Sequence, residues 1–128
     1  MEKHCIKIDG KEFPLAFALG TVEMLEAMIP AFEMGKLEEY MGSVKGLLDL
    51  IYCMAQQGAI RETGKPMKES RAWFGAYCPV NKKWMDMATV AIKSTFVDAM
   101  AMEADDEDED QEVDVVLENL KKKDGKTD

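Results

Sequence analysis

The chain has 128 residues and a formal net charge of −9, and this length suits one domain with its own buried core. Twelve Asp and Glu and four Lys give residues 103–128 a net charge of −8, so residues 1–102 carry −9 − (−8) = −1. Because nucleic acid and anionic membranes are recognised through clustered Lys and Arg, we expect neither as a partner.

The cysteines and the N-terminus bear on the cellular compartment. Cys5, Cys53 and Cys78 are odd in number and widely spaced, which favours reduced thiols over a disulfide framework. The first residues lack the basic and apolar regions of a signal peptide, and no run of about 18 apolar residues predicts a transmembrane helix. We therefore expect a cytoplasmic protein.

Residues 4–17 predict a β-hairpin. Residues 4–8 alternate between apolar and polar side chains, and Asp9-Gly10 then supplies the positive φ angles of a tight two-residue turn. Pro14 cannot donate to a ladder, so the return strand is an edge strand or its Pro14 faces outward. The apolar positions of the hairpin are Ile6, Ile8, Phe13, Leu15 and Phe17. Such a hairpin needs a helix to cover its apolar face.

The first predicted helix follows directly. Gly20 or Thr21 is expected to cap its N-terminus, and Pro30 ends it because the proline ring clashes with a continuing helix. Its apolar face consists of Val22, Leu25, Met28 and Ile29, at spacings of three and four residues.

The second predicted helix, over residues 36–57, has the clearest period in the chain. An unbroken apolar stripe lies on one side, Asp49 falls on the polar side, and Gly58 is expected to stop the helix in a left-handed conformation. Gly42 and Gly46 would let another backbone approach closely. We interpret this as packing inside the domain, with a partner-binding face as the alternative.

Two further helices and a change of composition complete the chain. A short third helix is predicted over residues 67–76, and a fourth from the N-cap Asn81 to about Met102. From Glu103 the chain is strongly acidic. Residues 105–110 are six consecutive acids, which repel one another and predict a solvated, disordered segment.

These elements predict a mainly α fold with a small N-terminal β-hairpin, an α+β arrangement. About four helices form one compact domain over residues 1–102. An acidic and mostly disordered tail follows over residues 103–128.

The sequence offers little for catalysis, and we expect neither an enzyme nor a cofactor. His4 is the single histidine, and its neighbour Cys5 would point to the opposite face of a strand, so the two cannot form a nucleophile–base pair. The Cys and His residues are not in the close pairs that zinc sites use.

A calcium site in the acidic run also fails on the sequence. Asp106, Asp108 and Asp110 match the first three ligand positions of an EF-hand loop. However, Gln111 stands where the turn needs Gly, and Leu117 stands where a bidentate Glu is needed. We therefore expect no metal site.

Partner binding is the remaining kind of function. The chain has eleven methionines, whose flexible side chains suit surfaces that accept varied apolar partners, although most would fill gaps in a small core. Trp84, Met87 and Ala91 align on the fourth helix away from its main core stripe and form a candidate partner-binding face. A second candidate is an amphipathic segment in the tail, with Val113, Val116, Leu117 and Leu120 as its contact residues.

Residues 4–29 carry a resemblance to a known family. The run Ile-Lys-Ile-Asp-Gly-Lys-Glu-Phe-Pro-Leu-Ala-Phe, followed by Leu-Gly-Thr-Val-Glu-Met-Leu-Glu, resembles the opening of the tail assembly chaperones of long-tailed bacteriophages and prophages. The resemblance continues as a pattern through residues 36–57 and 67–102. It implies a small helical, non-catalytic protein in the bacterial cytoplasm.

The resemblance also implies partners. Such chaperones are thought to coat the long helical tape-measure protein while the tail tube assembles. A ribosomal frameshift adds a second domain to some copies, and this longer form is thought to recruit the tail tube protein. Residues 121–123 are three lysines, which an adenine-rich slippery sequence could encode, so the chain is consistent with the short form. Self-association into a homo-oligomer stays open.

An alternative prediction uses the tail. An acidic adaptor or regulatory protein would bind a basic host or phage protein through residues 103–120. Removal of the tail separates the two predictions, because a chaperone that binds through its helices would keep its client.

Overall fold

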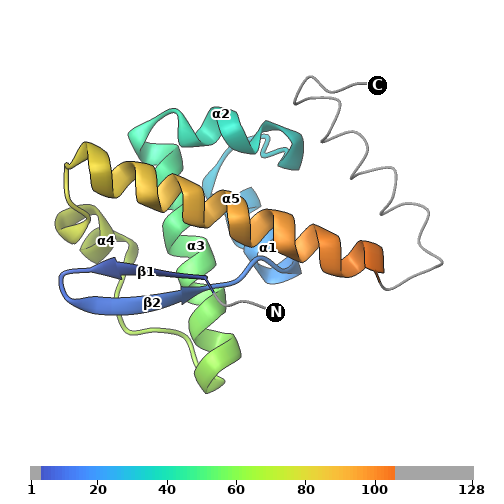
Figure 1. The fold of residues 1–128 in the computed structure, drawn as a ribbon, viewed down its shortest axis with the longest axis horizontal. Helices are drawn as coiled ribbons and strands as arrows, with labels where there is room; N and C mark the ends of the chain where they lie inside the picture. Colours follow the sequence, from blue (N-terminus) through green and yellow to red (C-terminus); the bar gives the residue numbers. More distant parts are fainter. Residues whose placement is uncertain (1–3, 106–128) are drawn as a thin grey trace.

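The computed structural model of the protein describes residues 4–105, and side chains over residues 4–101. The predicted fold class is confirmed, because a small antiparallel hairpin precedes a mainly helical body (Figure 1). The described part of the chain has five α-helices, one more than the predicted four or so. In order, the elements are β1 (His4–Ile8), β2 (Lys11–Leu15), α1 (Leu19–Met28), the 3-10 helix η1 (Met34–Lys36), α2 (Leu37–Met41), α3 (Val44–Thr63), α4 (Arg71–Tyr77) and α5 (Lys82–Asp105).

The hairpin has the predicted turn and the predicted inward face. Asp9 and Gly10 take φ angles of 53° and 79°, as a tight two-residue turn requires. Strand β1 pairs antiparallel with β2, with Ile6 opposite Phe13 and Ile8 opposite Lys11. The five apolar positions predicted for the hairpin are all buried: Ile6, Ile8, Phe13, Leu15 and Phe17.

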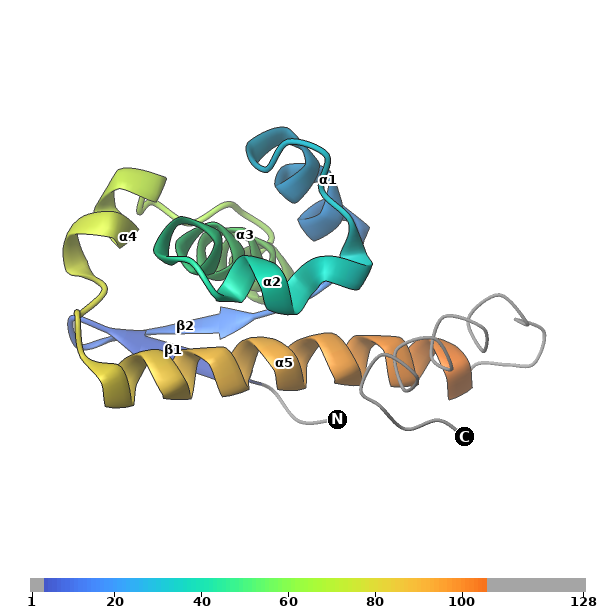
Figure 2. The same ribbon diagram turned by 90° about the horizontal axis from the view of Figure 1, so that it is seen from above.

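Helix α3 covers the outer edge of strand β2. A two-residue turn makes Cys5–Pro14 a non-hydrogen-bonded pair, so the missing N–H of Pro14 costs the ladder nothing, and its predicted edge position is confirmed. The carbonyl oxygen of Pro14 lies so close to Gly58 of α3 that an added Cβ would overlap it. Beyond β2, the Ala16 N–H donates to the Met54 carbonyl of α3 at 3.1 Å. In Figure 2 the hairpin lies between α3 and α5.

Helix α1 begins earlier than predicted. Ala18, not Gly20 or Thr21, is the N-cap residue, so the predicted cap is wrong. Thr21 instead lies buried in the first turn. Its Oγ1 accepts the Ala18 N–H at 3.0 Å and donates to the Ala16 carbonyl at 3.1 Å, so one hydroxyl satisfies two backbone groups.

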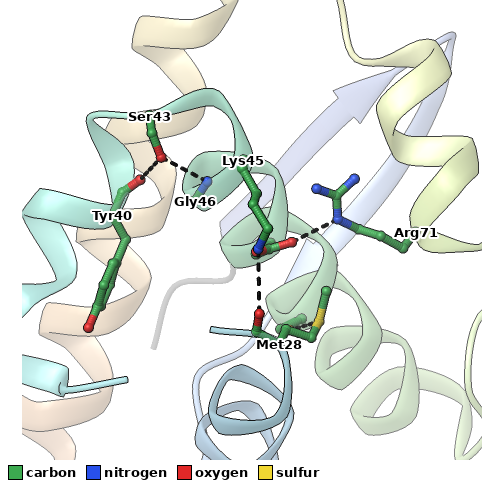
Figure 3. Close-up of polar contacts among 8 residues, drawn as sticks. Met28, Tyr40, Ser43, Lys45, Gly46 and Arg71 are labelled. Atoms are coloured by element: carbon green, nitrogen blue, oxygen red, sulfur yellow. Dashed lines mark hydrogen bonds and ion pairs between the residues drawn. The ribbon is translucent and has the colours of Figure 1, made fainter. Parts of the chain in front are cut away.

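The prediction of a single helix over residues 36–57 is wrong in two respects, because two helices, α2 and α3, cover this stretch and α3 extends beyond residue 57. The chain breaks between α2 and α3, where Ser43 caps α3 by accepting the Gly46 N–H at 3.1 Å (Figure 3). A Cβ at Gly46 would overlap the Tyr40 carbonyl, so close packing inside the domain is confirmed for this glycine. Helix α3 continues through Gly58 and ends at Thr63, where the C-cap Gly64 has a φ of 81°.

The last two helices follow the prediction at α5 and depart from it at α4. Ser70 caps α4, so this helix begins at Arg71 and not at residue 67. Asn81 caps α5 as predicted, because its Oδ1 accepts the Trp84 N–H at 3.0 Å. Helix α5 extends to Asp105, three residues beyond the predicted end, so the first residues of the predicted tail are helical. The rest of that tail lies outside the described residues.

Asp49 is the main correction inside the core. The sequence placed it on the polar side of the helix, but the residue is buried. Its carboxylate pairs with Lys45 Nζ at 2.7 Å and with Arg71 Nε of α4 at 2.9 Å (Figure 3). Lys45 Nζ also donates to the Met28 carbonyl at the end of α1, at 3.4 Å. A charge is tolerated inside because its oxygens are paired.

The core surrounds α3. Leu50, Ile51 and Met54 of this helix are fully buried, and side chains of the hairpin, α1, α4 and α5 pack around them. None of the helices within residues 4–105 is both long and apolar enough to cross a membrane.

Candidate partner-binding surface

Helix α5 has two opposite apolar faces. One face packs on the core through Ala88, Ile92 and Phe96, all of which are buried. About half a turn away lies a second row, which we call the outer stripe. It consists of Met87, Val90, Ser94, Val97 and Ala101. Met87, Val90 and Val97 are 60%, 62% and 55% exposed, so this second face is open to solvent.

The outer stripe has the spacing of a helix-pairing seam. Its members are separated by three, four, three and four residues, which keeps them in line along about four turns. At 1.5 Å per residue, the stripe is about 21 Å long. Figure 2 shows α5 along one side of the molecule, with α3 and the hairpin on the same side of it, and the stripe is opposite the face that packs on them. Exposed apolar side chains in such a row make it a candidate interaction surface.

Asp86, Lys93 and Asp98 border the outer stripe, and each has a hydrogen-bond or ion-pair partner within the chain. Asp86 pairs with Lys82 at 3.0 Å, one turn earlier on α5. Lys93 pairs with Glu38 of α2 at 2.9 Å. Asp98 Oδ2 lies 2.6 Å from His4 Nε2 on β1. A partner that covers the stripe therefore meets a polar border around an apolar centre, the usual anatomy of a protein interface.

The structure separates the three residues predicted on α5. Trp84 is half-buried against the core, and its indole N–H donates to the Lys7 carbonyl at 2.9 Å. That carbonyl points outward from the edge of β1, so Trp84 covers the second edge of the hairpin. Ala91 is also half-buried against the core, whereas Met87 lies on the outer stripe. Partner binding by Trp84 and Ala91 stays a prediction.

The tail residues of the candidate site cannot be placed on this surface. The four predicted contact residues lie outside the described part of the chain: Val113, Val116, Leu117 and Leu120. Their role in binding stays a prediction.

Two of the three cysteine thiols, which could act as nucleophiles, are buried or half-buried. Burial raises the pKa of the Cys53 thiol to about 12 and that of Cys78 to about 11, so both stay protonated at neutral pH and are poor nucleophiles. No three His, Cys, Asp or Glu side chains within the described residues are grouped to hold a metal ion. The absence of catalysis itself stays a prediction.

Sequence reasoning missed most of the outer stripe. Met87 was predicted, but Val90, Ser94 and Val97 were not, because the second apolar face was placed along Trp84, Met87 and Ala91. The signal was present in the spacing. Steps of three and four residues from Met87 lead through Val90, Ser94 and Val97 to Ala101.

In comparisons with known proteins, no family model, no curated protein and no solved structure matches the chain.

Proposed function

We propose that the protein is a tail assembly chaperone of a long-tailed bacteriophage or prophage. In this proposal it binds the tape-measure protein stoichiometrically and keeps it soluble during tail tube assembly. The protein acts in the bacterial cytoplasm by binding its client and not by catalysis. The proposal starts from the resemblance of residues 4–29 to this family, and the surface of α5 supports it.

The outer stripe is the observation that carries the proposal. A tape-measure protein is a long helix with apolar positions that aggregate when they are uncovered. The stripe offers a straight apolar row at helix-pairing spacing, between charged borders. A client helix that lies along α5 would bury Met87, Val90 and Val97, which are more than half exposed in the chain alone.

The charge of the chain supports the same function. The net charge of −9 makes coated complexes repel one another, which keeps a long apolar client from associating with other copies. In this proposal a frameshifted longer form, made near residues 121–123, recruits the tail tube protein.

Co-expression tests the proposal directly. The tape-measure protein encoded beside this chain is produced with and without it, and its soluble yield is measured. We expect a higher soluble yield and co-purification of the two proteins. An unchanged yield with no co-purification would refute the proposal.

The acidic run favours one second candidate. Residues 103–128 carry a net charge of −8, which suits an adaptor that binds a basic host or phage protein. Because α5 extends to Asp105, the discriminating deletion removes residues 106–128 and leaves this helix whole. The chaperone proposal predicts that the client still binds but that the complex is less soluble. The adaptor alternative predicts that binding is lost.

A further inference from the structure

We propose that, before a client arrives, the outer stripe pairs with the outer stripe of a second copy in antiparallel orientation. The client helix then replaces that copy. The pair itself is inferred from the residues of α5. Its role in regulating client binding rests on the proposed function.

The order of residues along the stripe favours an antiparallel pair. The stripe is nearly symmetric about Ser94, so a reversed copy presents the same row of positions. Met87 of one copy then faces Ala101 of the other, and Val90 faces Val97. The large Met87 thus meets the small Ala101, two valines meet each other, and Ser94 meets its own equivalent where the helices cross. A parallel pair would instead stack Met87 on Met87 and Ala101 on Ala101, which leaves uneven gaps.

The charges at the two ends of α5 favour the same orientation. Lys82 and Lys83 occupy the first turn, and Glu103 and Asp105 occupy the last. Antiparallel pairing brings the basic start of one helix beside the acidic end of the other. It also opposes the two helix dipoles. A parallel pair would bring the acidic ends of both copies together, where six consecutive acids begin at Asp105.

The charged side chains beside the outer stripe do not disfavour pairing with a second copy. Asp86 and Lys93 already have ion-pair partners within the chain, and Asp98 is hydrogen-bonded to His4, so a second copy need not bury a charge from this group that has no partner. One pair of helices about 21 Å long is a small interface. Small interfaces are weak and exchange readily, as replacement by a client requires.

The tail of the same chain is a less suitable occupant. Val113, Val116, Leu117 and Leu120 have helical spacing, but Glu112, Asp114 and Glu118 lie among them. If this segment folded back along α5, its acids would approach Asp98 and the acidic end of the helix, where like charges repel. The second copy brings basic residues to the same place.

Sedimentation equilibrium of the full chain alone tests the pair. We expect a mass that rises with concentration from 14.4 kDa toward 2 × 14.4 = 28.8 kDa. Val90→Glu should hold the mass at 14.4 kDa, because two carboxylates would be buried between the helices. Val44→Glu is the matched control. It adds the same charge at a 64%-exposed valine on α3 and should leave the pair intact.

A charge exchange tests the orientation. The double variant Val90→Glu with Val97→Lys places a carboxylate against an ammonium at both contacts of an antiparallel pair, so the 28.8 kDa species should return. In a parallel pair the like charges would meet, and the species would stay absent. Circular dichroism confirms that each variant keeps its helices. A variant that has lost them is replaced by Val97→Glu, which tests the same contact.

Three results would overturn the inference. They are a wild-type mass of 14.4 kDa at every concentration, a Val90→Glu variant that pairs like the wild type, and pairing that appears only after residues 106–128 are deleted. The last would assign the stripe to the tail. Client binding is scored separately by co-purification, so a wild-type chain that never pairs but still captures its client refutes only this inference. A pair without any capture refutes only the proposed function.

Discussion

At the scale of single residues, Asp49 is the buried charge on which three helices converge. Its carboxylate receives Lys45 of α3 and Arg71 of α4, and Lys45 reaches the last carbonyl of α1. Asp49→Ala would leave both cations without their partner. Since their side chains are 68% and 31% exposed, water would take over part of that interaction. We therefore expect a loss of about 2–3 kcal/mol in the free energy of unfolding, measured in urea.

The control for Asp49 is an exposed pair of the same kind. Asp86 also pairs with a lysine four residues away, but the two side chains are 66% and 87% exposed. Asp86→Ala should cost less than about 0.5 kcal/mol. Equal effects of the two substitutions would contradict the role assigned to the buried carboxylate.

Cys53 shows how burial changes reactivity. Burial and, to a lesser degree, the nearby Asp49 raise the thiol pKa from 9.0 to about 12. Iodoacetamide at pH 8 should therefore modify exposed Cys5 first and Cys53 last, as measured by peptide mass spectrometry. Equal rates at the two cysteines would contradict the burial of Cys53.

The same shift in pKa sets a dependence of stability on pH. Below pH 9 the Cys53 thiol is protonated in both the folded and the unfolded chain. Between pH 9 and 12 only the unfolded chain loses its proton, so the free energy of unfolding falls as pH rises through this window. Cys53→Ala should reduce that fall in urea titrations at pH 8 and pH 10. An identical fall in the variant would contradict the assignment.

At the scale of elements, contact between β2 and α3 explains what the sequence did not predict. Gly58 was expected to end a helix, but the structure uses it to admit the Pro14 carbonyl of β2. Gly58→Ala should therefore destabilise the fold by about 1–3 kcal/mol, because backbone atoms must move apart.

Gly75 is the matched control for this contact. It lies exposed on α4, and a Cβ there would meet only Arg71 Nη1, at 3.5 Å. Gly75→Ala should stabilise the protein by about 0.5–1 kcal/mol through helix propensity. Thermal unfolding of the two variants gives the comparison. A stabilising Gly58→Ala would contradict the observed packing.

The elements that were predicted correctly are those fixed by local signals. The Asp9-Gly10 turn, the alternating strands and the Asn81 cap each depend on residues that are neighbours in the chain. The extension of α3 past Gly58 depends on its contact with β2, which follows from the tertiary structure, so periodicity alone could not predict it. The break before Ser43 has a local signal, because Ser43 accepts the Gly46 N–H three residues later, but the apolar stripe continues across it.

The candidate site was predicted only in part for a similar reason. The sequence identified Met87 correctly as lying away from the core stripe, but it could not show that Trp84 turns toward the Lys7 carbonyl. A tryptophan with an apolar body and one N–H donor suits both a partner surface and a strand edge. The position of β1 beside α5 decides between these environments.

At the scale of the whole molecule, both edges of the hairpin are covered by other elements, whereas one face of α5 is exposed to solvent. Trp84 and α3 cover the two edges of the hairpin, which would otherwise invite strand pairing with another chain. On the outer stripe of α5, Met87, Val90 and Val97 then remain exposed. We therefore propose a structural role for the hairpin and a binding role for α5.

The most direct test of that assignment is capture of the tape-measure protein by stripe variants. Val90→Glu and the matched control Val44→Glu are each co-expressed with the client, and the captured client is quantified after purification. Both valines are more than 60% exposed, so neither change should disturb the core. The account predicts that Val44→Glu captures as much client as the wild type and that Val90→Glu captures at least tenfold less, the effect of about 1.4 kcal/mol in binding. Equal capture by the two variants would contradict it.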